Sequence, residues 1–172
     1  KHEWINTVIA NAGIGVSGKF SDLQIDDFKN QFDTNIYGVL HTAKIFEKHL
    51  RNTSGKFAIT SSILSYFVVK NNIPYCMSKY AVRALAEGLQ LEWKKHSISV
   101  THIAPGLIDS DFRLRDNTGL VHKDRPDPAP KFLVMPSKLA AKQIFHAVEA
   151  RQKEMIITYH GKFLVFCSLK FK

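Results

Sequence analysis

The chain alternates short apolar runs with long segments whose apolar residues recur at helical spacing. The first run, Thr7–Ala10, has no polar alternation and is followed closely by Gly13 and Gly15. Runs of this kind are typical of strands that are buried on both faces of a parallel sheet. Further runs lie at residues 57–62, 98–104 and 154–158. The pattern predicts an α/β fold in which four parallel strands are joined by helical connections.

The connections are predicted from the spacing of their apolar residues. Apolar residues recur at helical spacing from Phe28 to Leu50, which predicts one long helix with Asp22 as a cap of its first turn. A second helix is predicted over residues 74–95, and a third over 138–151 with Ser137 as its cap. Residues 111–131 contain three prolines and show no regular period. We expect them to form a mobile loop.

Tyr75 and Lys79 lie four residues apart, directly after Pro74. Proline is tolerated at the start of a helix, and side chains four apart share one face of it. A neighbouring ammonium favours the phenolate, so we expect the Tyr75 pKa to fall from its usual value of about 10. Ser62 ends the second predicted strand and is expected to face Tyr75. Tyrosine and lysine at this spacing are common on helices, so the pair indicates a functional site only when other motifs accompany it.

These motifs together resemble the short-chain dehydrogenase/reductase family. Tyr75 and Lys79 match its Tyr-x-x-x-Lys signature, and Ser62 stands at the family's usual distance before the tyrosine. Asn11-Ala12-Gly13 precedes them and Pro105-Gly106 follows, in the family's order. The resemblance implies a Rossmann-type doubly wound parallel sheet, of which this chain would hold the C-terminal half. It extends from Thr7 to about Tyr159.

We interpret residues 1–172 as a single partial domain of that family, with a substrate loop at 111–131 and an apolar, basic tail at 162–172. The family's glycine-rich phosphate turn, Gly-x-x-x-Gly-x-Gly, does not occur in this sequence. We therefore expect the chain to be the retained portion of a longer protein. The first strand should then expose an apolar edge.

The resemblance also implies roles for individual residues. Asn35, within Asn35-Ile36-Tyr37-Gly38, would hold a water linked to Lys79, although a buried amide more commonly satisfies a nearby backbone group. Ser65 stands where the family usually has glycine, and a side chain there is expected to reshape the pocket floor. The catalytic residues would be Asn35, Ser62, Tyr75 and Lys79. The residues that bind the cofactor, NAD or NADP, would be Asn11, Ala12, Gly13, Tyr75, Lys79, Pro105, Gly106, Ile108 and Ser110.

The composition argues against a nucleic-acid-binding protein, a metal site and a disulfide-rich protein. The formal charge of +9 comes from lysines and arginines scattered along the chain, which is not the pattern of a nucleic-acid surface. The two cysteines, Cys76 and Cys167, predict neither a metal site nor a disulfide framework, and they favour the reducing cytoplasm. The tail is interpreted as a rim of the substrate pocket or a subunit contact, with a membrane-surface anchor as the less favoured alternative.

The sequence therefore predicts an oxidoreductase that interconverts an alcohol and a carbonyl by hydride transfer, with Tyr75 as the general acid/base. Its substrate would be a small hydrophobic compound. The resemblance implies a homodimer or homotetramer formed through helices 26–50 and 74–95. The alternative is a non-catalytic fragment or interaction module that cannot hold the cofactor. The choice between NAD and NADP and the identity of the substrate stay open.

Overall fold

The centre of the molecule is a parallel sheet. In the computed structural model, which describes residues 4–171, the strands are β1 (Thr7–Ala10), β2 (Lys56–Thr60), β3 (Ser99–Ala104) and β4 (Glu154–Ile156). They lie in the order β1-β2-β3-β4, and each neighbouring pair is parallel. The predicted α/β class and the parallel sheet are confirmed, although several strands are shorter than the apolar runs that predicted them.

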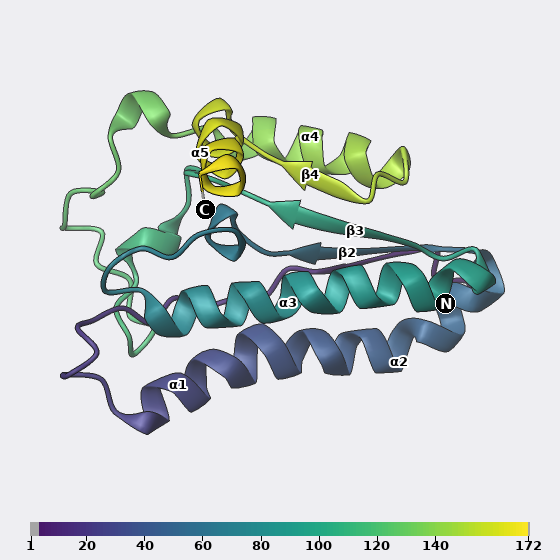
Figure 1. The fold of residues 1–172 in the computed structure, drawn as a ribbon, viewed down its shortest axis with the longest axis horizontal. Coiled ribbons are helices and arrows are strands. Elements are labelled where there is room, and N and C mark those ends of the chain that lie inside the picture. Colours follow the sequence, from purple (N-terminus) through teal and green to yellow (C-terminus); the bar gives the residue numbers. More distant parts are fainter. Residues whose placement is uncertain (1–3, 172) are drawn as a thin grey trace.

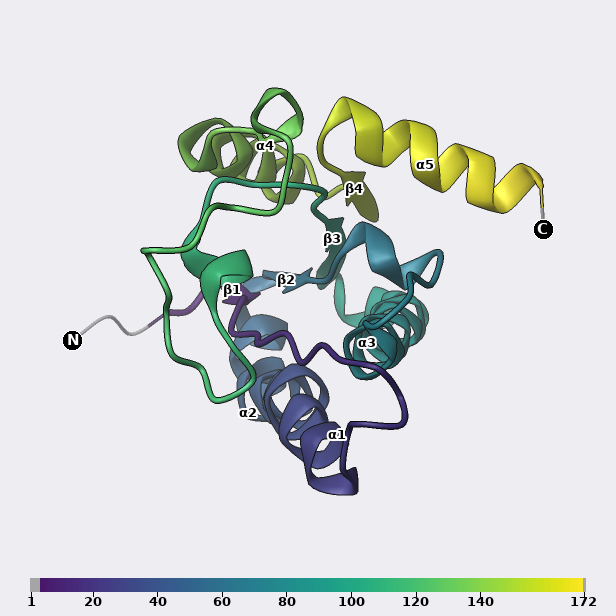
Figure 2. The same cartoon turned by 90° about the vertical axis from the view of Figure 1, so that its left-hand side faces the viewer.

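Helices cover both faces of this sheet (Figures 1 and 2). One face carries α1 (Ile25–Phe32), a π-helical turn (Asp33–Tyr37), α2 (Gly38–Thr53) and α3 (Ile73–Glu92). The other face carries α4 (Ser137–Glu149), and α5 (Tyr159–Lys170) extends beyond β4. Short 3-10 turns lie at Ile63–Ser65, Trp93–His96, Asp111–Leu114 and Lys131–Leu133. Among residues 4–171 we find no helix of the length and hydrophobicity that crossing a membrane requires.

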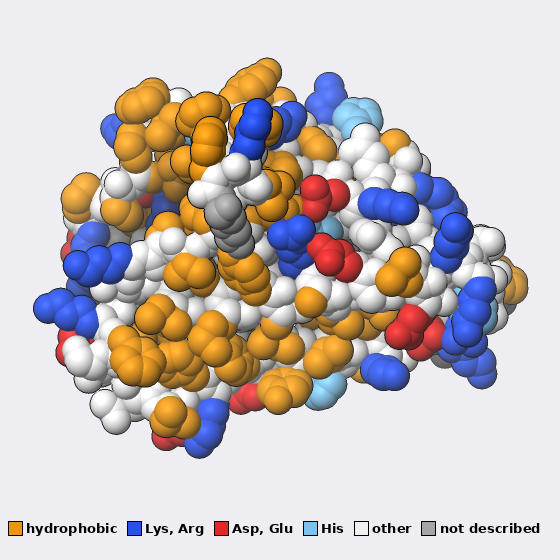
Figure 3. Space-filling view, in the orientation of Figure 1, with side chains coloured by type: hydrophobic (Ala, Val, Ile, Leu, Met, Phe, Trp, Pro, Cys, Tyr) orange, Lys and Arg blue, Asp and Glu red, His pale blue; other side chains and the backbone are white. Residues whose placement is uncertain are grey.

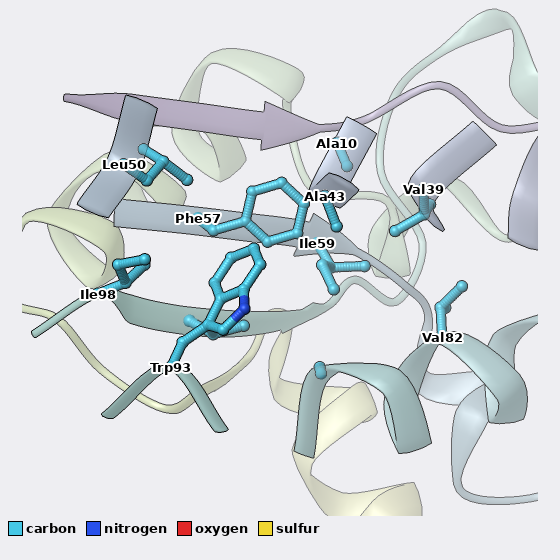
Figure 4. Close-up of a cluster of buried hydrophobic side chains, with 11 residues drawn as sticks. Ala10, Val39, Ala43, Leu50, Phe57, Ile59, Val82, Trp93 and Ile98 are labelled. Atoms are coloured by element: carbon cyan, nitrogen blue, oxygen red, sulfur yellow. The ribbon is translucent and has the colours of Figure 1, made fainter. Parts of the chain in front are cut away.

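The larger core lies between the sheet and the α2–α3 layer (Figure 4). Phe57 of β2 packs edge-on against Trp93, with 5.5 Å between the ring centroids. Burying a side chain of this size stabilises a fold by about 1.5–3 kcal/mol. The side chains buried with them are Ala10, Val39, Ala43, Leu50, Ile59, Val82, Ala86, Ile98 and Val100. A second cluster, which includes Ala58, Ile103 and Ala140, joins the opposite face to α4.

Two predicted helix caps are wrong. The N-cap of α1 is Gln24, whose backbone N–H donates to Asp27 Oδ2 at 2.8 Å in a capping box, so Asp22 lies outside the helix. Ser137 is the first residue of α4, and Pro136 occupies the cap with φ −56° and ψ 135°. The proline ring fixes that φ, and the Pro136 carbonyl accepts from Leu139 N at 3.0 Å and from Ala140 N at 3.1 Å.

β1 forms one edge of the sheet, as predicted. The Ile9 side chain is 48% exposed there, and Phe145 of α4 lies beside it in a shallow apolar groove. The predicted tail falls largely within α5, apart from Phe171, which follows the helix, and Lys172, which lies outside the described residues. Val165 is the buried anchor of α5 and packs with Ile63, Tyr66 and Ala104.

Candidate active site

The candidate residues converge at the carboxyl ends of the parallel strands. Residues 11–13 follow β1, Ser62 follows β2, and residues 105–108 follow β3. Ligands of open α/β sheets bind at this edge, because the loops that follow neighbouring strands meet there. The sheet therefore brings together segments that are far apart in the sequence.

Asn35 lies inside the π-helical turn between α1 and α2 and is almost completely buried. Its Oδ1 accepts from the Ile14 N–H at 2.9 Å, and its Nδ2 donates to Ile14 O and to Ser78 Oγ, both at 3.0 Å. Turns of this type often occur at functional sites, since the extra residue redirects a side chain. Asn35 thus satisfies a nearby backbone group and at the same time ties the loop after β1 to α3.

Gln31 adds a second link that the sequence analysis missed. It is fully buried, its Oε1 accepts from Val16 N at 2.7 Å, and its Nε2 donates to Ile14 O at 2.8 Å. Together Gln31 and Asn35 hold the backbone from Ile14 to Val16. The signal in the sequence was a second side-chain amide four residues before Asn35, which places both on one face of a helix.

Tyr75 and Lys79 project from the first turns of α3, with Pro74 at the start of the helix as predicted. The Lys79 side chain is buried, and its Nζ lies 5.5 Å from the centroid of the Tyr75 ring. Nζ donates to Thr60 O at 3.1 Å. A Cβ at Gly13 would lie 3.7 Å from this ammonium and 3.5 Å from Asn35 Oδ1. The predicted Asn35, Lys79 and Gly13 are therefore neighbours.

The expected fall of the Tyr75 pKa does not occur. Burial raises the pKa of the phenol to about 12, although the side chain as a whole is only partly buried, and a hydrogen bond with Ser62 opposes the rise. Burial also lowers the pKa of Lys79 to about 8. The ammonium lies near the ring rather than pairing with the phenol oxygen, so desolvation outweighs its attraction for the phenolate.

Ser62 lies just beyond β2 and caps the turn Ile63–Ser65, where its Oγ accepts from the Leu64 N–H at 3.1 Å. Ser61 bonds differently, since its Oγ donates to Lys79 O at 3.3 Å. Ser65 is fully buried and donates from Oγ to Ser62 O at 2.7 Å. Its side chain thus braces the backbone of Ser62.

The loop at 111–131 closes over the phenol through Phe112, which the sequence analysis did not single out. The Phe112 and Tyr75 ring centroids are 5.6 Å apart, and a Cβ at Gly15 would lie 3.0 Å from Phe112 Cζ. Ser17 N donates to Asn117 Oδ1 at 3.0 Å, and Asn117 Nδ2 donates to Ser17 O at 2.8 Å. These two bonds fasten the loop after β3 to the loop after β1.

The remaining cofactor candidates lie around these groups. Asn11, Ala12 and Ser110 are exposed, whereas Pro105, Gly106 and Ile108 are half-buried. Ile108 O accepts from Arg113 at 2.7 Å, and Arg113 also pairs with Asp127. The guanidinium is the main reason why the Asp127 pKa falls to about 2. The backbone at 105–108 is thus bonded to the same loop that carries Phe112.

The fold and the site together define an α/β protein with a Tyr–Lys pair at the ligand-binding edge of a parallel sheet. The sequence model of the family described as "short chain dehydrogenase" matches residues 1–119. The chain belongs to this family.

Relatives and solved structures agree with that assignment. The chain is 36% identical over 107 residues to an uncharacterized oxidoreductase of Staphylococcus aureus (strain MRSA252), covering 62% of this chain and 46% of that protein. It therefore spans about half the length of the curated relatives that it matches.

A 3-ketoacyl-ACP reductase from Sinorhizobium meliloti 1021 is 28% identical, with a TM-score of 0.74 over 90% of this chain and 68% of that one. A short chain dehydrogenase from Burkholderia cenocepacia J2315, solved in complex with NADP, has a TM-score of 0.81 at 20% identity. It covers 96% of this chain and 65% of that one, and at this identity the likeness shows the Rossmann-type fold alone.

Proposed function

We propose that this chain carries the catalytic half of an NAD(P)(H)-dependent oxidoreductase that interconverts an alcohol and a carbonyl. The observation that carries the proposal is the cluster of Ser62, Tyr75 and Lys79. The Ser62 hydroxyl is near enough to the phenol to oppose the rise of its pKa, and a buried ammonium lies near the phenol ring. General acid/base catalysis needs a proton donor within hydrogen-bond reach of the group that it protonates, and a carbonyl oxygen between Ser62 and Tyr75 would meet that requirement.

The residues present fit a pyridine dinucleotide. The Lys79 ammonium is buried, and one hydrogen bond, to Thr60 O, is recorded for it among the described residues. An ammonium has three donors, so it can also bind hydroxyl groups such as those of a ribose. Gly13 leaves space beside it. The structure of an ElxO variant with NADPH bound is 30% identical, with a TM-score of 0.59 over 61% of this chain and 43% of that one, which supports the same class of cofactor here. The nicotinamide would supply or accept the hydride.

The chain's own residues would manage the proton. A pKa of about 12 keeps Tyr75 protonated at neutral pH, which suits a group that donates to a carbonyl oxygen as it becomes an alcohol. Ser62 would hydrogen-bond that oxygen, Lys79 would hold the ribose, and Asn35 would place the water that links Lys79 to solvent. Phe112 favours a small hydrophobic substrate, because its ring covers the phenol.

Replacing Tyr75 by phenylalanine tests the proposal. The change removes the proton donor and keeps the ring, so turnover of a carbonyl substrate with NADH or NADPH should fall about 100- to 10,000-fold. Tyr159→Phe is the matched control, since Tyr159 is 89% exposed on α5. Near-normal turnover of the Tyr75→Phe protein would refute the assignment. If the unaltered protein fails to shift NADPH fluorescence, the better interpretation of the chain is a non-catalytic interaction module.

We further propose that the protein is a homodimer or homotetramer formed through α1–α2 and α3. A groove between these helices is lined by Leu40, Ala43, Leu85 and Gly88. Hydrophobic side chains gather over the same layer in Figure 3.

The cytoplasm is the compartment that we propose on the basis of cysteine usage, since both cysteines are free thiols. Nucleic acid is not a proposed partner, and a membrane-surface role for α5 is the less favoured alternative to a pocket rim or subunit contact.

A further inference from the structure

The turn that follows β3 is crowded by residues from the far end of the chain. A Cβ at Gly106 would overlap Thr158 Oγ1 and would lie 2.6 Å from His160 Nε2. Gly106 N donates to Ile157 O at 3.3 Å, so the two backbones are held side by side. Glycine is therefore required at position 106 because the segment 158–160 presses against it.

Thr158 reaches this contact in an unfavourable backbone conformation. Its φ is 78° and its ψ is 142°, although it is β-branched and almost completely buried. A positive φ at such a residue is a genuine outlier, and conformations of this kind persist only when surrounding contacts impose them. Thr158 Oγ1 accepts from Gly161 N at 3.2 Å and thereby caps α5. The strained residue places His160 on the first turn of that helix.

His160 meets the backbone of the turn through one ring nitrogen. The Leu107 N–H donates to His160 Nε2 at 3.2 Å, and Thr158 Oγ1 lies at the same distance from that nitrogen. A nitrogen that accepts from an amide must be without its own proton, so the hydrogen bond assigns the neutral ring with its proton on Nδ1. Protonation would turn Nε2 into a donor facing another donor.

We propose that His160 is a positioning residue for the backbone of residues 105–108. Its neutral ring holds this backbone in place, and protonation of the ring releases it. The inference rests on the proposed function, because that backbone is where the nicotinamide end of the cofactor would bind. Leu107 precedes Ile108, so an anchor at the Leu107 amide sets the direction of the Ile108 peptide groups. His160 acts through the backbone and has no catalytic role of its own.

The surroundings of His160 keep the ring neutral. Burial lowers its pKa, and no charged neighbour contributes to the shift. The charged residues that follow Leu107 in the chain are Asp109, Asp111 and Arg113, and the guanidinium of Arg113 is paired with Asp127. Lys162 on α5 is exposed. The ring therefore exchanges its proton below its ordinary range, and the Leu107 anchor should be lost as the pH falls below about 6.5.

The first test needs no cofactor. The amide resonance of Leu107 should shift with pH together with the His160 ring resonances, and its exchange with solvent should quicken once the ring is protonated. The same spectra of His160→Gln, whose side-chain oxygen can accept without titrating, should show a Leu107 amide that does not respond to pH. A Leu107 amide that is insensitive to pH in the unaltered protein would overturn the proposal.

The second test measures the dissociation constant of NADPH by fluorescence between pH 5 and 8. We expect it to rise about tenfold in the unaltered protein at the acid end, since one hydrogen bond to the turn is lost. His160→Gln should bind as tightly as the unaltered protein at pH 8 and lose the pH dependence, whereas His160→Ala should bind weakly throughout. The exposed His41→Gln is the control and should keep the dependence.

An unchanged pH dependence in His160→Gln would also overturn the proposal. The proposed function and the role of His160 can be refuted separately. If the unaltered protein does not bind NADPH at any pH, the proposed function is wrong, while the Leu107 resonance still decides the role of His160.

Discussion

Lys79 holds a charge in a place that water barely reaches. The residue is 5% exposed, and burial alone moves its pKa from 10.5 to about 8. A shift of this size corresponds to a cost on the order of 3 kcal/mol while the ammonium is charged. A purely structural residue would rarely be kept at such a cost, because an apolar side chain of similar length fills the same space. The cost therefore supports the role that we propose for Lys79.

This cost predicts how stability depends on pH. Below pH 8 Lys79 is charged in both folded and unfolded chains, so the full cost applies, and it disappears as the pH rises from 8 towards 10.5. The unaltered protein should therefore gain stability relative to Lys79→Met over that interval. Urea unfolding of both proteins at pH 7, 8.5 and 10 measures the difference. A difference that is the same at all three values would contradict the folded-state pKa.

The positions of the candidate site residues could be predicted from the sequence, but their ionisation could not. The four-residue spacing after Pro74 is enough to place Tyr75 and Lys79 on one side of α3. The pKa of Tyr75 depends on whether burial or the ammonium has the larger effect. That balance is set by the packing around the phenol, including Phe112 from a remote loop, and no local pattern in the sequence encodes it.

At the scale of elements, the loops after β1 and β3 behave as a pair. Asn117 bonds both the N–H and the carbonyl of Ser17, and these bonds cross from one loop to the other. Asp116 instead bonds within its own loop, to Thr118 and His122. The closed position of Phe112 on Tyr75 therefore depends on a small number of hydrogen bonds, each contributing about 0.5–1.5 kcal/mol.

Breaking the link between the loops should open the site. We expect Asn117→Ala to raise the rate of trypsin cleavage within residues 111–131 by about 5- to 100-fold, because cleavage follows the population of the open loop. Leu120→Ala, an exposed position in the same loop, serves as the control. Equal cleavage rates in the two variants would show that the Asn117 bonds do not hold the loop closed.

The elements also show where sequence patterns stop being informative. The apolar spacing from Phe28 to Leu50 predicted one helix, and the chain does run as one helical body, yet the π-helical turn at Asp33–Tyr37 was not foreseen. An inserted residue leaves the apolar residues on each side regularly spaced, so the periodicity hardly changes. His160 escaped notice for a related reason, since its partner Leu107 lies 53 residues away.

At the scale of the whole molecule, the proposed assembly can be tested by a substitution at Gly88. A Cβ at Gly88 would meet nothing within 4 Å, although the residue lines the groove between α2 and α3. Gly88→Arg therefore introduces no clash inside one chain but places a charge where a second copy would pack. Light scattering should show a smaller assembly, whereas the exposed Asn52→Arg should leave it unchanged. An unchanged mass for Gly88→Arg would place the interface elsewhere.

The helical turn around Asn35 makes the length of this region matter as much as its composition. Each residue of an α-helix advances the chain by about 100° around the axis. The π-helical turn Asp33–Tyr37 takes up one residue more than an α-helical turn, so a deletion of one residue there would leave α1 and α2 in register. A deletion of one residue early in α2 would instead swing α1 through roughly that angle and carry Gln31 away from Val16. The fold should thus tolerate the loss of one residue better within these five residues than in α2, although the Asn35 side chain would then point in a different direction.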